Sequence, residues 1–157
     1  MVTTGIQLDD QSVTVSDSDS VERRRLSALV ADGPIILAFI PAAYTGTCTE
    51  ELCTVRDRFP TGISAHTLFP VSVDSPFVHQ QYREDHDLPF PFISDFNRTL
   101  IDALDLSMDF EDIGLYGLAK RAFVALDTAR TVTYFWVADH PGELPPFDQI
   151  ESDLVNT

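Results

Sequence analysis

Two long apolar runs dominate the hydrophobic and polar pattern of the chain and predict buried strands. Residues 35–40 are apolar without interruption, and residues 66–73 are apolar except at positions 66, 67 and 72. Such runs are typical of central strands that are covered on both faces. Two further runs, 122–126 and 131–138, lie on either side of a tight turn and predict a hairpin.

Apolar residues at helical spacing predict helices between these strands. From position 48 to position 59, Cys48, Leu52, Val55 and Phe59 fall on one stripe of a helix. The same spacing, together with turn residues at the ends, predicts the other helices. Their ranges are 21–30, 76–86, 100–104 and 147–155.

The first of these helices is also predicted from a capping signal. Asp19 is followed three residues later by Glu22, which is the spacing of a capping box. The residues expected to face the core are Leu26, Leu29 and Val30. Residues 16–20 would form a polar turn before the helix, and Gly33 and Pro34 would end it.

The order of these elements predicts an α/β protein. Strands alternate with helices, a short strand is expected at 90–94, and the late hairpin and last helix follow. This order suits a thioredoxin-like fold, with a central mixed β-sheet that has a mainly parallel core and is flanked by helices, although several small α/β folds share it. No repeat or linker divides the chain, so we expect a single domain over residues 1–157.

The charge balance excludes several classes of partner. The 157 residues include 25 Asp and Glu against 10 Lys and Arg, for a net charge of -15. Binding to nucleic acids or to anionic membranes needs a basic surface and is therefore disfavoured. Lys120 is the only lysine, and this scarcity favours an acidic, halophilic protein kept in solution in a salt-rich cytosol.

The chain shows no sign of a membrane or secretory segment. It has no uncharged apolar run of membrane-spanning length, and its first residues lack a basic stretch followed by an apolar core. We therefore expect a cytoplasmic protein. Its 44% hydrophobic content is that of a globular chain rather than a disordered one.

The two cysteines, Cys48 and Cys53, indicate redox or nucleophilic chemistry. Two cysteines are too few for a disulfide framework, and no second pair or histidine cluster accompanies them, so a metal site is not expected. Cys48 lies where a buried strand and a short loop lead into a helix. The first turn of a helix has unpaired N–H groups and stabilises a thiolate. On this argument alone, an inert buried cysteine is an equally good interpretation of Cys48.

The residues around Cys48 resemble the active-site loop of the peroxiredoxin family (AhpC/TSA type), whose pattern is Pro-x-x-x-Thr-x-x-Cys. Pro41, Thr45 and Cys48 match it, and Glu51 matches a family glutamate. Three further stretches resemble the family in the same order, and the resemblance extends over residues 33–143. These stretches are 73–76, 88–95 and 120–127.

The resemblance points to two branches of the family and departs from it at one end. The spacing of Cys48 and Cys53 is similar to that of the Q-type (bacterioferritin-comigratory) branch, and residues 140–143 are similar to the one-cysteine E-type branch. The family's opening Ala-Pro-x-Phe is absent, and residues 5–20 replace its first hairpin only loosely.

This resemblance implies a thiol-dependent peroxidase that reduces hydrogen peroxide and organic hydroperoxides without a metal or organic cofactor. Cys48 would attack the peroxide and become a sulfenic acid. The Cys48 N–H, the Thr45 hydroxyl and Arg121 would stabilise the transition state. Pro41 would shield the sulfenic acid, and Glu51 would orient Arg121. The alternative interpretations are that Arg121 is a charged residue on the surface and that Glu51 is a solvent-exposed residue of its helix.

The resemblance to the Q-type branch also implies that Cys53 resolves the sulfenic acid of Cys48. In an intact helix, residues five apart have Cα atoms about 8.6 Å apart and point about 140° away from each other. A disulfide needs Cα atoms within about 7 Å, so the helix must unwind first. Two alternatives stay open, a packing role for Cys53 and a one-cysteine mechanism in which an external thiol attacks Cys48.

Other functions remain as alternatives at this stage. A thioredoxin-like disulfide reductase would carry Cys-x-x-Cys, whereas four residues separate these cysteines, and a non-catalytic binding module would leave the matched loop unexplained. The resemblance implies a thioredoxin- or glutaredoxin-like reductant as partner, and either a monomer or a homodimer.

Overall fold

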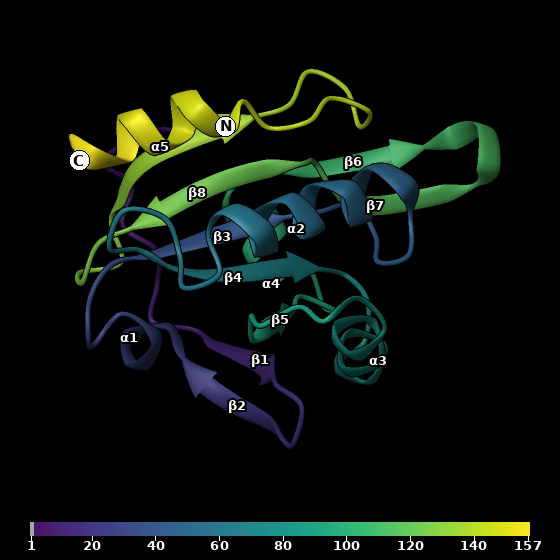
Figure 1. Cartoon of the computed structure of the whole chain (residues 1–157), viewed down its shortest axis with the longest axis horizontal. Coiled ribbons are helices and arrows are strands. Elements are labelled where there is room, and N and C mark those ends of the chain that lie inside the picture. The colour runs from purple at the N-terminus through teal and green to yellow at the C-terminus, as the bar shows by residue number, and fades with distance from the viewer. Residues whose placement is uncertain (1) are drawn as a thin grey trace.

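The computed structural model describes residues 2–157 and contains a seven-stranded mixed sheet with helices on both faces (Figure 1). The strands are β1 (Ser12–Ser16), β2 (Val21–Arg25), β3 (Ile35–Phe39), β4 (Thr67–Ser72), β5 (Phe92–Ser94), β6 (Ser107–Phe110), β7 (Leu115–Ala119), β8 (Ala122–Leu126) and β9 (Val132–Val137). The helices are α1 (Leu26–Leu29), α2 (Gly46–Arg58), α3 (Pro76–His86), α4 (Thr99–Ala103), the 3₁₀ turn η1 (Glu111–Ile113) and α5 (Phe147–Val155).

The sheet has the strand order β2-β1-β5-β4-β3-β8-β9, while β6 and β7 form a separate hairpin. Only the pairs β3–β4 and β4–β5 are parallel. The mixed sheet of a thioredoxin-like fold is thus confirmed, and its three central strands, β5, β4 and β3, form the expected parallel core. Hairpins at both ends of the sheet add antiparallel neighbours, and β8 runs antiparallel to β3.

Strand β3 lies between the two hydrophobic cores. Ile35, Leu37 and Phe39 pack into the core on one face of the sheet, which also takes in α1 and α4. Ile36 and Ala38 pack into the core on the other face, with α2 and α5. Successive strand residues point to opposite faces, so an unbroken apolar run is what a strand covered on both sides requires, and the prediction for residues 35–40 is confirmed.

The predicted helix over residues 21–30 is wrong in its first half. Residues Val21–Arg25 form strand β2, in which every residue is exposed, and only Leu26–Leu29 is helical. The cap was misassigned because the turn before the strand uses Asp17, whose carboxylate accepts from the N–H groups of Asp19 and Ser20 and closes a β1–β2 hairpin. The predicted core residues of this segment are nevertheless buried, namely Leu26, Leu29 and Val30.

The remaining predicted elements are present, and a second hairpin was missed besides β1–β2. Helices α3 and α5 have the predicted bounds, and α2 begins two residues earlier than its apolar stripe. The β6–β7 hairpin was not predicted. It projects from the end of the sheet that lies near the N-terminal end of α2 (Figure 1). Among residues 2–157, no helix has both the length and the hydropathy needed to cross a bilayer.

Candidate active site

The loop between β3 and α2 is fixed from the side of β4 and α3. The Ala43 N–H donates to Asp74 Oδ2 over 2.7 Å, and the same oxygen accepts from the Ser72 hydroxyl over 2.7 Å. The Ser72 hydroxyl also lies 2.6 Å from Nε2 of the buried His79. Burial lowers the pKa of His79 to about 4, so this imidazole is neutral at physiological pH. The loop is therefore anchored by a buried polar chain that the sequence did not reveal.

A second contact holds the loop at Tyr44. This residue has a φ of 65°, a left-handed conformation that is strained for a bulky side chain. Its ring packs edge-on against Tyr82 at 4.8 Å, and its hydroxyl donates to Asp85 over 2.7 Å. Tyr82 in turn shares a 2.8 Å hydrogen bond with Thr49 in the first turns of α2. These contacts tie the strained loop and the start of α2 to α3.

Cys48 lies in the first turn of α2 and is almost completely buried, at 1% exposure. Thr45 precedes the helix, and the first helical hydrogen bond runs from the Thr49 N–H to the Thr45 carbonyl over 3.0 Å. The N–H of Cys48 therefore has no partner within the helix. The thiol and an unpaired N–H thus lie at the positive end of the helix dipole.

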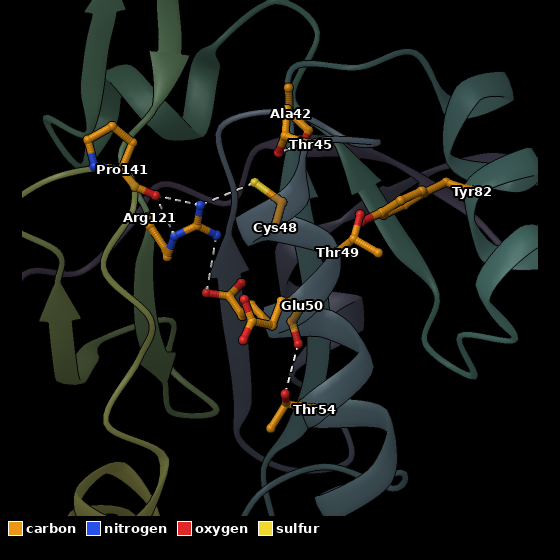
Figure 2. A network of polar contacts seen from close by, with 10 residues as sticks. Ala42, Thr45, Cys48, Thr49, Glu50, Thr54, Tyr82, Arg121 and Pro141 are labelled. Atoms are coloured by element: carbon orange, nitrogen blue, oxygen red, sulfur yellow. Dashed lines mark hydrogen bonds and ion pairs between the residues drawn. The ribbon is translucent and has the colours of Figure 1, made fainter.

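Arg121 reaches this thiol from the adjoining strand. Phe39, the last residue of β3, pairs with Ala122, the first residue of β8. Arg121 directly precedes Ala122 and therefore lies beside the end of β3. Figure 2 shows its guanidinium directed at Cys48, with Nη2 3.3 Å from Sγ. The Arg121 side chain is only 1% exposed, which excludes the surface-charge interpretation.

Two further groups hold Arg121 in place. The Pro141 carbonyl accepts from Nη2 over 2.8 Å and from Nε over 3.2 Å. Glu51, one turn after Cys48 on α2, is fully buried, and its Oε1 lies 3.5 Å from Nη1. Glu51 is thus not a solvated helix residue. The role of Pro141 was missed, because nothing in the sequence shows that a backbone carbonyl twenty residues later faces this arginine.

Burial dominates the electrostatics of Glu51. It raises the pKa of this carboxyl to about 8, although Arg121 pulls the value down. Oε2 is buried and has no hydrogen-bond partner among residues 2–157. At neutral pH the carboxyl therefore holds a proton much of the time, and the Arg121 charge is then available to the thiol.

The matched residues gather around one cleft of about 380 Å³. It is lined by Pro41, Thr45, Cys48 and Arg121, together with residues of the β6–β7 hairpin. The Thr45 hydroxyl donates to the Ala42 carbonyl over 2.9 Å, a bond within the loop itself (Figure 2). The structure thus brings together the sequence-predicted residues except Cys53.

Cys53 lies further along α2, which is continuous over Gly46–Arg58. It is partly exposed and does not belong to the buried face of α2, which holds Cys48, Leu52 and Val55. Both cysteines are free thiols in this structure. In the intact helix they cannot bond to each other, so a disulfide between them requires local unwinding.

A buried thiol at a helix N-terminus beside a buried arginine, on a thioredoxin-like fold, is the arrangement of a thiol-based redox enzyme. Comparison with known proteins identifies the family to which this enzyme belongs. The model of the AhpC/TSA family matches residues 7–135, and peroxiredoxin Bcp of Bacillus subtilis is 34% identical over 116 residues, 69% of this chain and 73% of the relative. The chain belongs to the AhpC/TSA family of peroxiredoxins and is a thiol-dependent peroxidase.

Solved structures agree with this assignment. The crystal structure of peroxidoxin BcpB from Mycobacterium tuberculosis is 26% identical, with a TM-score of 0.80, and the match covers 98% of this chain and 97% of that one. PrxQ from Xylella fastidiosa has the same fold, with a TM-score of 0.78 at 18% identity over 98% of this chain and 96% of its own.

Proposed function

We propose that Cys48 is the cysteine that reacts with the hydroperoxide. The observation that carries this assignment is the 3.3 Å contact between the buried Arg121 Nη2 and the Cys48 sulfur. A guanidinium in this position stabilises a thiolate and leaves further N–H groups for the oxygens of the substrate.

In the first step, the Cys48 thiolate attacks the terminal oxygen of R–O–O–H. The S–O bond forms as the O–O bond breaks, and the RO⁻ that leaves takes up a proton to become ROH. Cys48 is oxidised to a sulfenic acid and the peroxide is reduced. Negative charge spreads over both oxygens in the transition state, where fixed donors contribute most. The donors offered here are Arg121 and the Cys48 N–H, with the Thr45 hydroxyl in reach once it leaves the Ala42 carbonyl.

Pro41 and Glu51 have supporting roles in this proposal. Pro41 lines the cleft beside Cys48 and restricts access of a second peroxide to the sulfenic acid. Glu51 positions the guanidinium from the side opposite Pro141.

We infer that Cys53 resolves the sulfenic acid. Its thiol attacks the Cys48 sulfur, the S–S bond forms, and the hydroxyl leaves as water. This requires the first turns of α2 to unwind, and the partly exposed position of Cys53 leaves it free to react once they do. In the alternative one-cysteine mechanism, an external thiol attacks Cys48 and Cys53 is idle.

The wider setting is part of the same proposal. A thioredoxin- or glutaredoxin-like dithiol would supply the two electrons that reduce the disulfide. The chain would act as one domain over residues 1–157, as a monomer or homodimer, in a salt-rich cytoplasm that suits its net charge of -15.

A peroxide pulse followed by peptide mapping tests both cysteine assignments. The wild-type protein should yield a peptide linked through Cys48 and Cys53, and far-UV circular dichroism should show a small loss of helix. Cys53→Ser should still form a sulfenic acid, whereas Cys48→Ser should consume no peroxide. A stable sulfenic acid beside a free Cys53 in the wild type would establish the one-cysteine mechanism instead.

A further inference from the structure

The peptide group between Ala42 and Ala43 is held at both of its ends. Its N–H donates to Asp74 Oδ2 over 2.7 Å, and its carbonyl accepts from the Thr45 hydroxyl over 2.9 Å. The N–H and the carbonyl of a trans peptide belong to one rigid plane and point in opposite directions. A rotation of this plane would break both hydrogen bonds, so Asp74 fixes the direction in which the Ala42 carbonyl points.

Asp74 is itself fixed by the sheet and by α3. The Ser72 hydroxyl donates to Oδ2 over 2.7 Å, and the Ser94 hydroxyl donates to the main-chain carbonyl of Asp74 over 2.6 Å. Because the Ser72 hydroxyl has only one proton, it accepts from Nε2–H of His79, which lies 2.6 Å away. Nδ1 of His79 then carries no proton, and it is a buried atom without a hydrogen-bond partner within residues 2–157. The position of Oδ2 is thus set by β4, β5 and α3 rather than by the loop.

The group at the other end of this peptide is the Thr45 hydroxyl, which the proposed reaction uses. Thr45 is exposed, so packing does not hold its side chain. The bond to the Ala42 carbonyl is the only hydrogen bond that its hydroxyl makes to the described part of the chain (Figure 2). During the reaction the O–H turns from this carbonyl to the peroxide while the oxygen stays in place. With the carbonyl turned away, the side chain could adopt other rotamers, and the donor would no longer be preorganised.

We propose that Asp74 is a positioning residue for the peroxidase reaction and acts through the Ala42–Ala43 peptide group on the Thr45 hydroxyl. The inference rests on the proposed reaction at Cys48, in which Thr45 is one of the donors to the peroxide. Asp74 does not line the cleft that holds Cys48 and Thr45. Its effect on the rate should therefore pass through Thr45.

The first test is single-turnover oxidation of Cys48 by hydrogen peroxide in a Cys53→Ser background. Asp74→Ala should slow this oxidation about three- to tenfold, and by no more than Thr45→Val does, because one hydrogen bond is at stake. Asp74→Asn keeps an acceptor oxygen but loses the charge that strengthens the bond, so its rate should lie between those of wild type and Asp74→Ala. An unchanged rate in Asp74→Ala overturns the proposal.

The second test asks whether the effect passes through Thr45. In a Thr45→Val background, Asp74→Ala should cause no further loss, since residues that act as one unit are not additive. Alkylation of Cys48 by iodoacetamide does not use the Thr45 donor and should keep its wild-type rate. Additive losses in the double variant, or an equal loss with both reagents, would show a general disturbance of the site and overturn the proposal.

Asp85→Ala is the matched control. Asp85 is also a carboxylate that holds this loop, through a 2.7 Å bond from the Tyr44 hydroxyl, but it has no contact with the Ala42–Ala43 peptide group. Asp85→Ala should leave the rate of peroxide oxidation unchanged. Slowing equal to that in Asp74→Ala would mean that any loosening of the loop has this effect, and the specific role of Asp74 would be wrong.

A second variant covers the case in which circular dichroism shows that Asp74→Ala does not fold. Ser72→Ala keeps Asp74 but removes the O–H that fixes Oδ2, and it should cause a smaller loss that is again absent in the Thr45→Val background. No loss, or the same loss in both backgrounds, overturns the proposal. If hydrogen peroxide fails to oxidise Cys48 in the parent protein, the proposed reaction itself is wrong. If the parent reacts and the Asp74 variants match it, only this inference fails.

Discussion

Replacing Arg121 by Met should slow oxidation of Cys48 by hydrogen peroxide about 10²–10³-fold. That is the usual cost of removing one preorganised donor from a developing oxyanion, equivalent to about 2.7–4 kcal/mol. The upper part of this range is expected, because the donor is buried and fixed. It lies 3.3 Å from the sulfur and is held by the Pro141 carbonyl at 2.8 Å.

The fold should survive this substitution at neutral pH. Removal of one partner of a buried ion pair usually costs about 3–5 kcal/mol, because a buried charge is left behind. Burial already raises the pKa of Glu51 to about 8, and Arg121 is the group that lowers it. Without Arg121 this pKa rises further, so Glu51 becomes neutral and no buried charge remains.

The assay is single-turnover oxidation in a Cys53→Ser background, read by mass spectrometry, beside alkylation of the same thiol by iodoacetamide. A donor to the peroxide oxygens should matter far more for the peroxide than for the alkylating agent. Arg121→Lys keeps the positive charge but loses the planar guanidinium and its several N–H donors. Its rate of oxidation by peroxide should lie between the rates of wild type and Arg121→Met. Equal loss with both reagents, or no loss with either, would refute the assigned role.

Four other outcomes are expected. Thr45→Val should slow peroxide reduction about tenfold, the worth of one hydrogen bond, measured by the same single-turnover assay. The pKa of Glu51 is raised from 4.5 in the unfolded chain to about 8 in the folded protein, so between these values the folded state holds a proton that the unfolded chain has released. The melting temperature should therefore fall as the pH rises from 4.5 to about 8, and Glu51→Gln should remove that part of the decline. Tyr44→Phe loses the bond to Asp85 and should speed disulfide formation severalfold relative to sulfinic acid formation under excess peroxide, as mapped by mass spectrometry. The melting temperature should climb from 0.01 M salt, where the Debye length is about 30 Å, towards molar salt, and a flat profile would argue against a halophilic protein.

Local signals explain the elements that were predicted well from the sequence. Helix α3 has Pro76 in its first turn, and the Ser75 hydroxyl accepts from the Val78 N–H at its start. Asp87, in a left-handed conformation, ends it. All three lie in the helix or directly beside it in the sequence. Strand β2 was wrongly predicted to be helical because its residues are all exposed and show no alternation of apolar and polar positions. Only its hydrogen-bonded pairing with β1 makes it a strand.

The residues of the candidate active site that belong to the family motif could be predicted from the sequence. Pro41, Thr45 and Cys48 lie in one segment, and Arg121 and Glu51 were identified through a family resemblance. The groups that hold them were not predictable, because each contact joins segments far apart in the chain. Examples are Asp74 to the Ala43 N–H and the Pro141 carbonyl to Arg121. Strands β6 and β7 are short, and Gly117 interrupts β7, so their pairing gave no signal along the sequence.

Locating the first sulfur to be oxidised tests most directly whether Cys48 reacts with the peroxide. Cys53→Ser protein is mixed with one equivalent of hydrogen peroxide in the presence of dimedone, and the adduct is mapped by peptide mass spectrometry. Labelling should be rapid and confined to Cys48, and Cys48→Ser protein treated in the same way should not be labelled. Labelling of Cys53 in the Cys48→Ser protein at a comparable rate, or an unreactive Cys48, would contradict this assignment.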